Sequence, residues 1–124
     1  MPSAELITQT VNRYLELVSN GTAADIVELF TEDATVEDPV GGGETHIGRQ
    51  AILGFYKNME SAGREAELLA IRVGGHEANF MFALTVTVGE AKMRIEPMEV
   101  MVFDNEGKIT AMKAYWGPEN VTQL

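Results

Sequence analysis

Two adjacent carboxylates stand at the end of a short β-forming run, directly before a proline and a glycine-rich loop. Residues 34–36 form the run, Glu37 and Asp38 follow it, and Pro39 comes next. Proline biases the preceding residue toward an extended conformation, so the Asp38 side chain projects at a defined angle while the backbone turns. A carboxylate held in this way is a candidate general base, and the alternative is ordinary Asp-Pro turn chemistry.

The composition restricts the class of site that this chain can build. Its 124 residues predict one domain, residues 1–124, which is large enough to enclose a core and a pocket. The chain has no cysteine, and His46 and His76 lack the spacing of metal ligands. We therefore expect no metal site and no cofactor.

The charge argues against polyanionic partners. Nine basic and nineteen acidic residues give a formal net charge of −10, which repels nucleic acid and anionic membranes. The first residues contain neither a basic lead-in nor an uninterrupted apolar stretch, so we expect no signal peptide and no membrane span. These features predict a cytoplasmic protein that binds a small molecule.

Three segments carry the apolar periodicity of a helix. The first begins at a possible N-cap, Ser3, and ends at Asn20. The second opens with Thr22 and Asp25, which resemble a capping box, and the third runs from about residue 49 to 59. Their apolar faces are Ile7, Val11, Tyr14 and Val18; Ile26, Leu29 and Phe30; and Ile52, Phe55, Tyr56 and Met59.

Beyond Gly63 the apolar residues alternate, which predicts an antiparallel meander of strands. One strand carries apolar residues on both faces, and its outer face, Met98, Val100 and Val102, is the kind of surface that a second copy covers. We therefore expect a homodimer. A last strand is predicted over residues 109–116. The residues that share one face in each of the other predicted strands are Leu69, Ile71 and Val73; Phe80, Phe82, Leu84, Val86 and Val88; and Met93, Ile95, Pro97, Glu99, Met101 and Phe103.

Helices followed by antiparallel strands indicate an α+β fold, in which three helices pack into a curved antiparallel or mixed sheet. Such a cone encloses an apolar cavity of the kind that holds a small ligand. Each candidate lining residue is also a plausible core residue, because packing is the default use of aromatic and methionine side chains. The candidates are Tyr14, Val18, Phe55, Tyr56, Phe82, Met101, Met112 and Trp116.

Several blocks of the chain resemble the Δ5-3-ketosteroid isomerases of the cone-shaped, nuclear-transport-factor-2-like (SnoaL-like) superfamily. The most specific block is Ala-Thr-Val-Glu-Asp-Pro at residues 34–39. Less specific matches are Arg13 with Tyr14, Phe55 with Tyr56, and residues 114–117. The resemblance implies that Asp38 is the general base. It implies an oxyanion-hole tyrosine at Tyr14, a supporting tyrosine at Tyr56 and a steroid-packing aromatic at Trp116.

The chain departs from the family pattern at two positions. Glu99 stands where the family has an aspartic acid as second oxyanion donor, and Phe30 stands where it has a further supporting tyrosine. We expect a shorter tyrosine network, limited to Tyr56 and Tyr14. We also expect burial to keep Glu99 protonated, so that it donates to the same oxyanion as Tyr14.

The implied activity is the conversion of 3-oxo-Δ5-steroids to 3-oxo-Δ4-steroids by proton transfer through a dienolate, without a cofactor. Asp38, Tyr14 and Glu99 would be catalytic, and the remaining cavity residues would bind a steroid-like substrate. Two alternatives remain open from sequence: another enzyme of this fold, such as a polyketide cyclase, epoxide hydrolase or dehydratase, and a non-catalytic steroid or lipid binder. A carboxylate beside an apolar cavity carries a desolvation penalty that argues against a pure binder.

Overall fold

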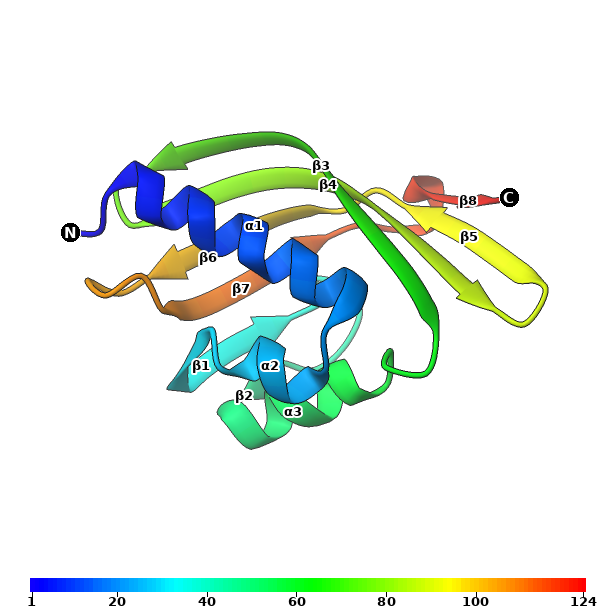
Figure 1. Ribbon diagram of the computed structural model, residues 1–124, viewed down its shortest axis with the longest axis horizontal. Helices are drawn as coiled ribbons and strands as arrows, with labels where there is room; N and C mark the ends of the chain where they lie inside the picture. The colour runs from blue at the N-terminus through cyan, green and yellow to red at the C-terminus, as the bar shows by residue number, and fades with distance from the viewer.

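Eight strands form one curved mixed sheet, and helices lie across its concave side (Figure 1). This computed structural model describes residues 1–124. The helices are α1 (Ala4–Asn20), α2 (Ala23–Val27), α3 (Arg49–Lys57) and the short 3-10 turn η1 (Pro118–Asn120). The strands are β1 (Phe30–Glu37), β2 (His46–Ile47), β3 (Gly63–Gly74), β4 (Glu77–Val88), β5 (Ala91–Ile95), β6 (Met98–Phe103), β7 (Ile109–Tyr115) and β8 (Val121–Gln123).

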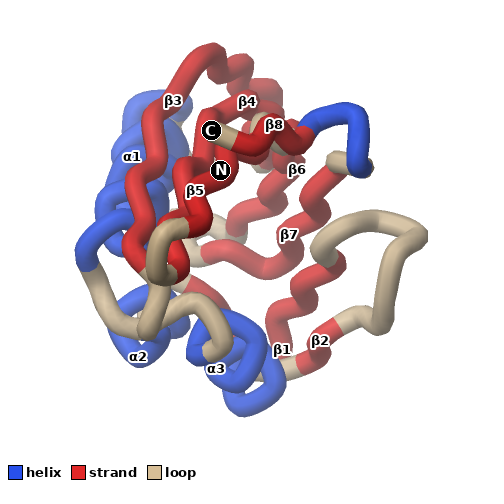
Figure 2. The backbone as a smooth tube through the Cα atoms, turned by 90° about the vertical axis from the view of Figure 1, so that its right-hand side faces the viewer, coloured by secondary structure: helices blue, strands red, loops and turns tan.

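The strand order is β2-β1-β7-β6-β4-β5-β8, with β3 paired to the free side of β4. Strands β1 and β7 are parallel, and the other pairs are antiparallel. Figure 2 looks along the fold and shows the sheet curling from β3 through β6 and β7 to β1 and β2, with the helices on the opposite side. The expected α+β class with a curved mixed sheet is therefore confirmed.

The helix starts follow the signals in the sequence. The Ser3 hydroxyl accepts a hydrogen bond from the backbone N–H of Leu6 and caps α1. Thr22 and Asp25 form a reciprocal capping box at the start of α2. These local hydrogen bonds fix where the chain turns from one helix into the next.

The placement of Phe30 on the apolar face of the second helix is wrong. Helix α2 ends at Val27, and Phe30 is instead the first residue of β1, where it is fully buried. The backbone N–H of Ile109 donates to the Leu29 carbonyl, which ties this segment to β7. Pairing with a distant strand therefore overrides the local helical spacing.

A β-bulge changes which residues of β3 point inward. The pairing of β3 with β4 shifts register between Leu68 and Ala70. Leu68 packs against the core before the bulge, and Ile71 and Val73 do so after it, whereas Leu69 is 38% exposed. The expectation that Leu69 shares the inner face with Ile71 and Val73 is thus wrong, because one extra residue inverts the alternation.

The strand predicted from Met93 to Phe103 is broken at Pro97. Strand β5 pairs with Leu84–Val88 of β4, and β6 pairs with Glu77–Met81 of the same strand. Proline has no N–H to donate to a ladder, so the chain bends between the two halves of β4. The bend turns the inner face of β6 toward α1. The last strand, β8, has no counterpart among the predicted strands.

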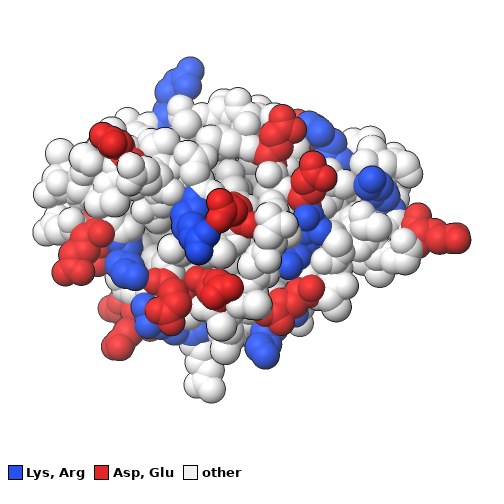
Figure 3. Space-filling view, viewed as in Figure 1, with Lys and Arg blue, Asp and Glu red and all other residues white.

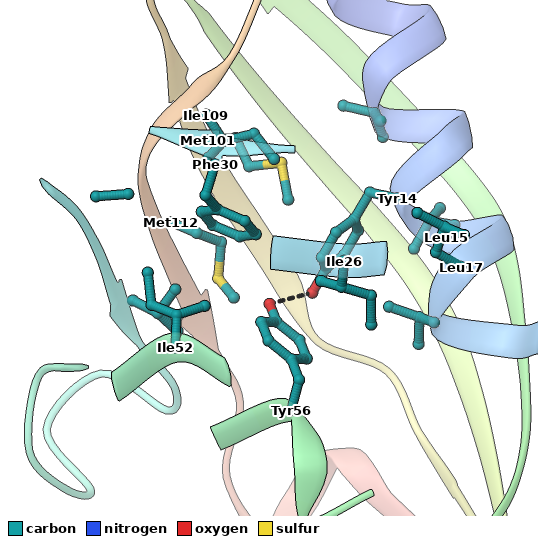
Figure 4. Packing of buried hydrophobic residues seen from close by; sticks show 14 of the residues in the cluster. Tyr14, Leu15, Leu17, Ile26, Phe30, Ile52, Tyr56, Met101, Ile109 and Met112 are labelled. Atoms are coloured by element: carbon teal, nitrogen blue, oxygen red, sulfur yellow. Dashed lines mark hydrogen bonds between the residues drawn. The ribbon is translucent and has the colours of Figure 1, made fainter. Parts of the chain in front are cut away.

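The core fills the space between α1 and the sheet. Phe30, Met101 and Met112 lie close together next to the Tyr14 and Tyr56 side chains (Figure 4). On the surface, acidic and basic side chains are interspersed over the face in Figure 3, without a continuous basic stripe. None of the helices combines the length and apolar character needed to cross a bilayer.

Candidate active site

A cavity of about 230 Å³ lies inside the cone, between α1, α3 and the sheet. Ten of its thirteen lining residues are hydrophobic, so it suits a mostly hydrocarbon ligand. A larger depression of about 380 Å³ lies around Arg72 and Val100 but includes no buried titratable side chain. The inner cavity is therefore the better candidate site. Its lining residues are Tyr14, Val18, Asp38, Phe55, Tyr56, Met59, Phe82, Leu84, Val86, Ile95, Pro97, Glu99 and Trp116.

Two tyrosine hydroxyls meet at the inner end of this cavity. Tyr14 comes from α1 and Tyr56 from the last turn of α3, and their hydroxyl oxygens are 2.8 Å apart (Figure 4). Both side chains are 2% exposed, and their rings meet edge to face. Burial raises the pKa of each hydroxyl well above its usual value, and the Glu99 carboxyl would add to the effect once ionised. Both tyrosines therefore remain neutral hydrogen-bond donors.

The hydrogen-bonded tyrosine network stops at Tyr56. Phe30 packs against the Tyr56 ring, with 6.2 Å between the ring centroids, but it has no hydroxyl to extend the network. This agrees with the short network expected from the sequence. The Tyr56 hydroxyl is thereby left to pair with Tyr14.

Asp38 follows the end of β1 and lines the cavity. The indole N–H of Trp116 donates a hydrogen bond to Asp38 Oδ1 at 2.7 Å. The two residues meet because β1 and β7 are adjacent parallel strands, with Glu37 opposite Lys113. Burial raises the pKa of Asp38, whereas the Trp116 hydrogen bond and the nearby His46 charge lower it. The carboxylate is held by one oxygen, through a hydrogen bond that favours its ionised form.

Glu99 reaches the same cavity from the inner face of β6 and is only 2% exposed. Its Oε1 atom has no hydrogen-bond partner, which is unusual for a buried polar atom. Burial raises the pKa of Glu99 well above its usual value, and the negative charge of Asp38 raises it further. The site thus combines Asp38, whose charged form is supported by the Trp116 hydrogen bond, with Glu99, whose burial favours the protonated form and whose Oε1 atom has no partner.

The structure brings most of the predicted site residues together. Val18, Phe55, Phe82 and Trp116 line the cavity along with the polar groups. Met101 and Met112 do not line it, because they are buried in the core beneath it. We therefore do not propose substrate contact for these two methionines.

Several lining residues have no place in the sequence-based set of site residues. Met59, Leu84, Val86, Ile95 and Pro97 complete the apolar wall. All five occupy the inward positions of the predicted helix and strands, so the alternation contains a signal for them. By contrast, no sequence signal indicates that Trp116 donates to Asp38, since the two are 78 positions apart.

No three His, Cys, Asp or Glu side chains come together in an arrangement that would hold a metal ion. The polar groups in the cavity are two carboxyls and two phenols, with the Trp116 indole at its wall. Such a set can remove a proton from a carbon acid and donate hydrogen bonds to the anion that forms.

Comparisons with known proteins agree with this geometry. Residues 11–112 match the family described as the SnoaL-like domain. The chain is 45% identical over 117 residues to the steroid Delta-isomerase of Nocardioides simplex, an alignment that covers 94% of this chain and 93% of that protein. It also resembles the solved structure of SalBIII, an epoxide hydrolase/cyclase-like enzyme with a role in pyran ring formation in the polyether salinomycin. That match has a TM-score of 0.91 and 28% identity and covers 100% of both chains.

The buried Glu99 carboxyl predicts a specific pH dependence of stability. Because the folded protein holds this proton more tightly than the unfolded chain does, the free energy of unfolding falls as the pH rises above the usual glutamate pKa of 4.5. Glu99→Gln removes this titration, so its stability relative to wild type should increase progressively from that pH upward. Urea denaturation at several pH values measures the difference, with the exposed Glu44→Gln as control. Parallel curves for Glu99→Gln and wild type would contradict the burial argument.

Proposed function

The chain belongs to the SnoaL-like family and is a homologue of steroid Delta-isomerase, and we propose that it converts 3-oxo-Δ5-steroids to 3-oxo-Δ4-steroids. The observation that carries this proposal is that one apolar cavity holds two carboxyls in different surroundings: a hydrogen bond favours the ionised form of Asp38, and burial favours the neutral form of Glu99. The reaction requires a base and neutral acids at the same time, in a site without water. The difference in burial and hydrogen bonding between the two carboxyls supplies both.

Asp38 is the proton shuttle of the proposed reaction. Its carboxylate removes a proton from the carbon between the carbonyl and the double bond, and the C–H electron pair forms a dienolate with negative charge on the carbonyl oxygen. The same proton then returns to the far carbon of the former double bond, so the substrate keeps all its atoms. A single carboxylate can serve both transfers when the proton leaves one carbon and returns to the other on the same face of the flat substrate.

Trp116 supports this role by holding one oxygen of the base. Its indole N–H donates to Asp38 Oδ1, which leaves Oδ2 available for the substrate proton. The same hydrogen bond favours the ionised form of Asp38 and so opposes the effect of burial on its pKa. The Trp116 ring also lines the cavity, where it packs against the substrate.

Tyr14 and Glu99 are the proposed donors to the dienolate oxygen. With Tyr56 as the donor of the hydrogen bond between the two hydroxyls, Tyr14 accepts it and keeps its single O–H for the dienolate oxygen at the inner end of the cavity. The free Oε1 of Glu99 supplies a second polar atom with no competing partner in the protein. Fixed donors in a low-dielectric cavity stabilise a developing oxyanion more than donors in water do.

The apolar wall favours a flat hydrocarbon substrate such as a steroid. Val18, Phe55, Phe82, Met59 and Leu84 surround the space beyond the polar groups and offer no hydrogen bonds from their side chains. Substrate binding there is driven by burial of apolar surface.

Epoxide opening is a second candidate, because the solved relative SalBIII is an epoxide hydrolase/cyclase-like enzyme. The same pair of carboxyls suits that chemistry: Glu99 would donate a proton to the epoxide oxygen while Asp38 accepts one from the attacking hydroxyl. The higher identity to a steroid Delta-isomerase favours the isomerase. Parallel assays with a β,γ-unsaturated 3-ketosteroid and a hydroxy-epoxide separate the two candidates.

We also propose that the protein is a homodimer formed through the outer face of the sheet. Met98 is 47% and Tyr115 46% exposed on this face, where they are paired across β6 and β7. Val100 and Val102 continue the face and are half-buried in a single chain. An apolar sheet face of this kind is a typical isologous interface.

Asp38→Asn should remove most isomerase activity, because the amide keeps the shape of the side chain and loses its basicity. We expect kcat to fall by about 10²-fold to 10⁴-fold, the usual scale for a general base. Steroid affinity should stay within a few-fold. Ultraviolet absorbance of the conjugated enone measures the rate, and Glu37→Gln, which changes the neighbouring carboxylate, is the matched control. Near-wild-type turnover in Asp38→Asn would end the assignment of the base.

Glu99→Gln should retain more activity than Glu99→Leu, because only glutamine keeps a neutral donor. Loss of one oxyanion donor in Glu99→Leu should lower kcat by roughly 10²-fold to 10³-fold. In a crystal structure with an enolate-mimicking phenolic steroid, the Tyr14 and Glu99 oxygens should both lie within hydrogen-bond distance of the ligand oxygen. Equal activities of the two variants, or Glu99 turned away from the ligand, would leave Tyr14 as the only donor.

Sedimentation equilibrium at micromolar concentration should give about twice the mass of one chain. Val100→Asp places a charge in the middle of the proposed interface and should shift the protein to the monomer, since an unpaired buried charge is costly. Val88→Asp, at an exposed position at the end of β4, is the control. A wild-type protein that remains monomeric would refute the dimer.

A further inference from the structure

His46 lies on the same face of the sheet as the catalytic cavity. In the pairing of β1 with β2, His46 stands opposite Val36, which is fully buried on the inner face. Its imidazole packs on the Phe55 ring with 4.8 Å between centroids and a tilt of 38°. Because Phe55 is part of the cavity wall, His46 forms a second layer directly behind it.

The same register brings His46 close to Asp38. Asp38 follows the last residue of β1, and its side chain lines the cavity on the inner face of the sheet, where Val36 is buried. His46, which is paired with Val36, therefore lies on the same face of the sheet as Asp38 and two positions along β1 from it. Burial raises the pKa of Asp38, and the hydrogen bond from Trp116 and the nearby His46 charge lower it.

The other charged groups around this pair are few. On β1, Glu37 points to the opposite face from Val36 and lies beside Gly41, and Glu44 is exposed in the loop before β2. On α3, Arg49 donates two hydrogen bonds to the Phe30 carbonyl, and Lys57 is exposed.

Glu99 and Tyr14 also line the cavity, and burial favours the neutral form of each. His46 is therefore the basic side chain that lies on the face of the sheet occupied by Asp38 and also contacts the cavity wall.

We propose that His46 is a positioning residue that acts through Asp38: its protonated imidazole favours the ionised, base-competent carboxylate, and its ring supports the Phe55 wall of the cavity. The inference rests on the proposed function, because it assumes that Asp38 is the base. The support matters most on the acidic side of the pH profile, where the carboxylate base is nearest to protonation. The effect extends the acidic range over which the site stays active.

Two substitutions separate the charge of His46 from its packing. His46→Phe keeps an aromatic ring against Phe55 and removes the charge, whereas His46→Lys keeps a charge and loses the ring. Aspartate carboxyl-carbon NMR follows the titration of Asp38, with the resonance assigned by its absence in Asp38→Asn. His76→Gln, which replaces the only other histidine in the chain, is the matched control, and His46→Gln replaces His46→Phe if the latter does not fold.

The Asp38 titration midpoint should move upward in His46→Phe and should not do so in His46→Lys or His76→Gln. In the same variant, kcat/KM at pH 5 should fall by about two- to five-fold, the range expected of a partly screened charge pair, with no loss at pH 8. An unchanged midpoint in His46→Phe, or the same rise in His46→Phe and His46→Lys, would overturn the proposal.

The NMR titration and the activity assay test the role of His46 and the proposed function independently. If the midpoint moves as expected but the wild-type protein shows no isomerase activity, the coupling between His46 and Asp38 stands and the proposed function fails. If the wild-type protein is an active isomerase, and kcat/KM falls at the same acidic pH in wild type and His46→Phe, the proposed function stands and the role of His46 is refuted.

Discussion

The exclusion of water from the inner end of the cone is the constraint on which the site depends. Burial is the largest cause of the raised pKa at Tyr14, Tyr56, Glu99 and Asp38. It favours the protonated, hydrogen-bond-donating form of Tyr14, Tyr56 and Glu99. Asp38 differs because Trp116 stabilises its charge through a hydrogen bond, and because Asp38 lies nearer the exposed loop. One buried environment therefore contains both the proton donors and the candidate base.

The irregular features of the sheet are what direct these groups into one space. The bend at Pro97 lets β5 and β6 follow different halves of β4, which turns Glu99 toward α1. The parallel pairing of β1 and β7 places Asp38 beside Trp116. The start of β1 at Phe30 puts an apolar ring, with no hydroxyl, beneath Tyr56. Glu99 thus adds a buried carboxyl to the cavity, and Phe30, which has no hydroxyl, ends the hydrogen-bonded network at Tyr56.

Part of the fold and of the site could be predicted from local pattern and resemblance. The Ser3 cap and the Thr22–Asp25 capping box are local hydrogen bonds, so a few residues suffice to specify them. The predicted alternation of β4 holds from Phe80 to Val86, whereas Val88 at the end of the strand is exposed. The register of β3 could not be predicted from the sequence. The bulge at Leu69 reverses the alternation of this strand, and only its pairing with β4 shows the bulge. Phe30 follows helical spacing locally but joins β1, since its backbone pairs with β7 far along the chain.

The sequence by itself determined the residue types that can do the chemistry: a carboxylate before a proline, a tyrosine on an apolar helix face, and a glutamic acid among apolar strand residues. Only the tertiary structure decided which of them share a cavity. It placed Met101 and Met112 in the core, although their spacing is as suitable as that of Phe82. It also joined Trp116 to Asp38 and His46 to Phe55. The physical reason is that periodicity specifies the face on which a side chain lies, whereas depth, distance and pKa depend on the residues that other parts of the chain bring against it.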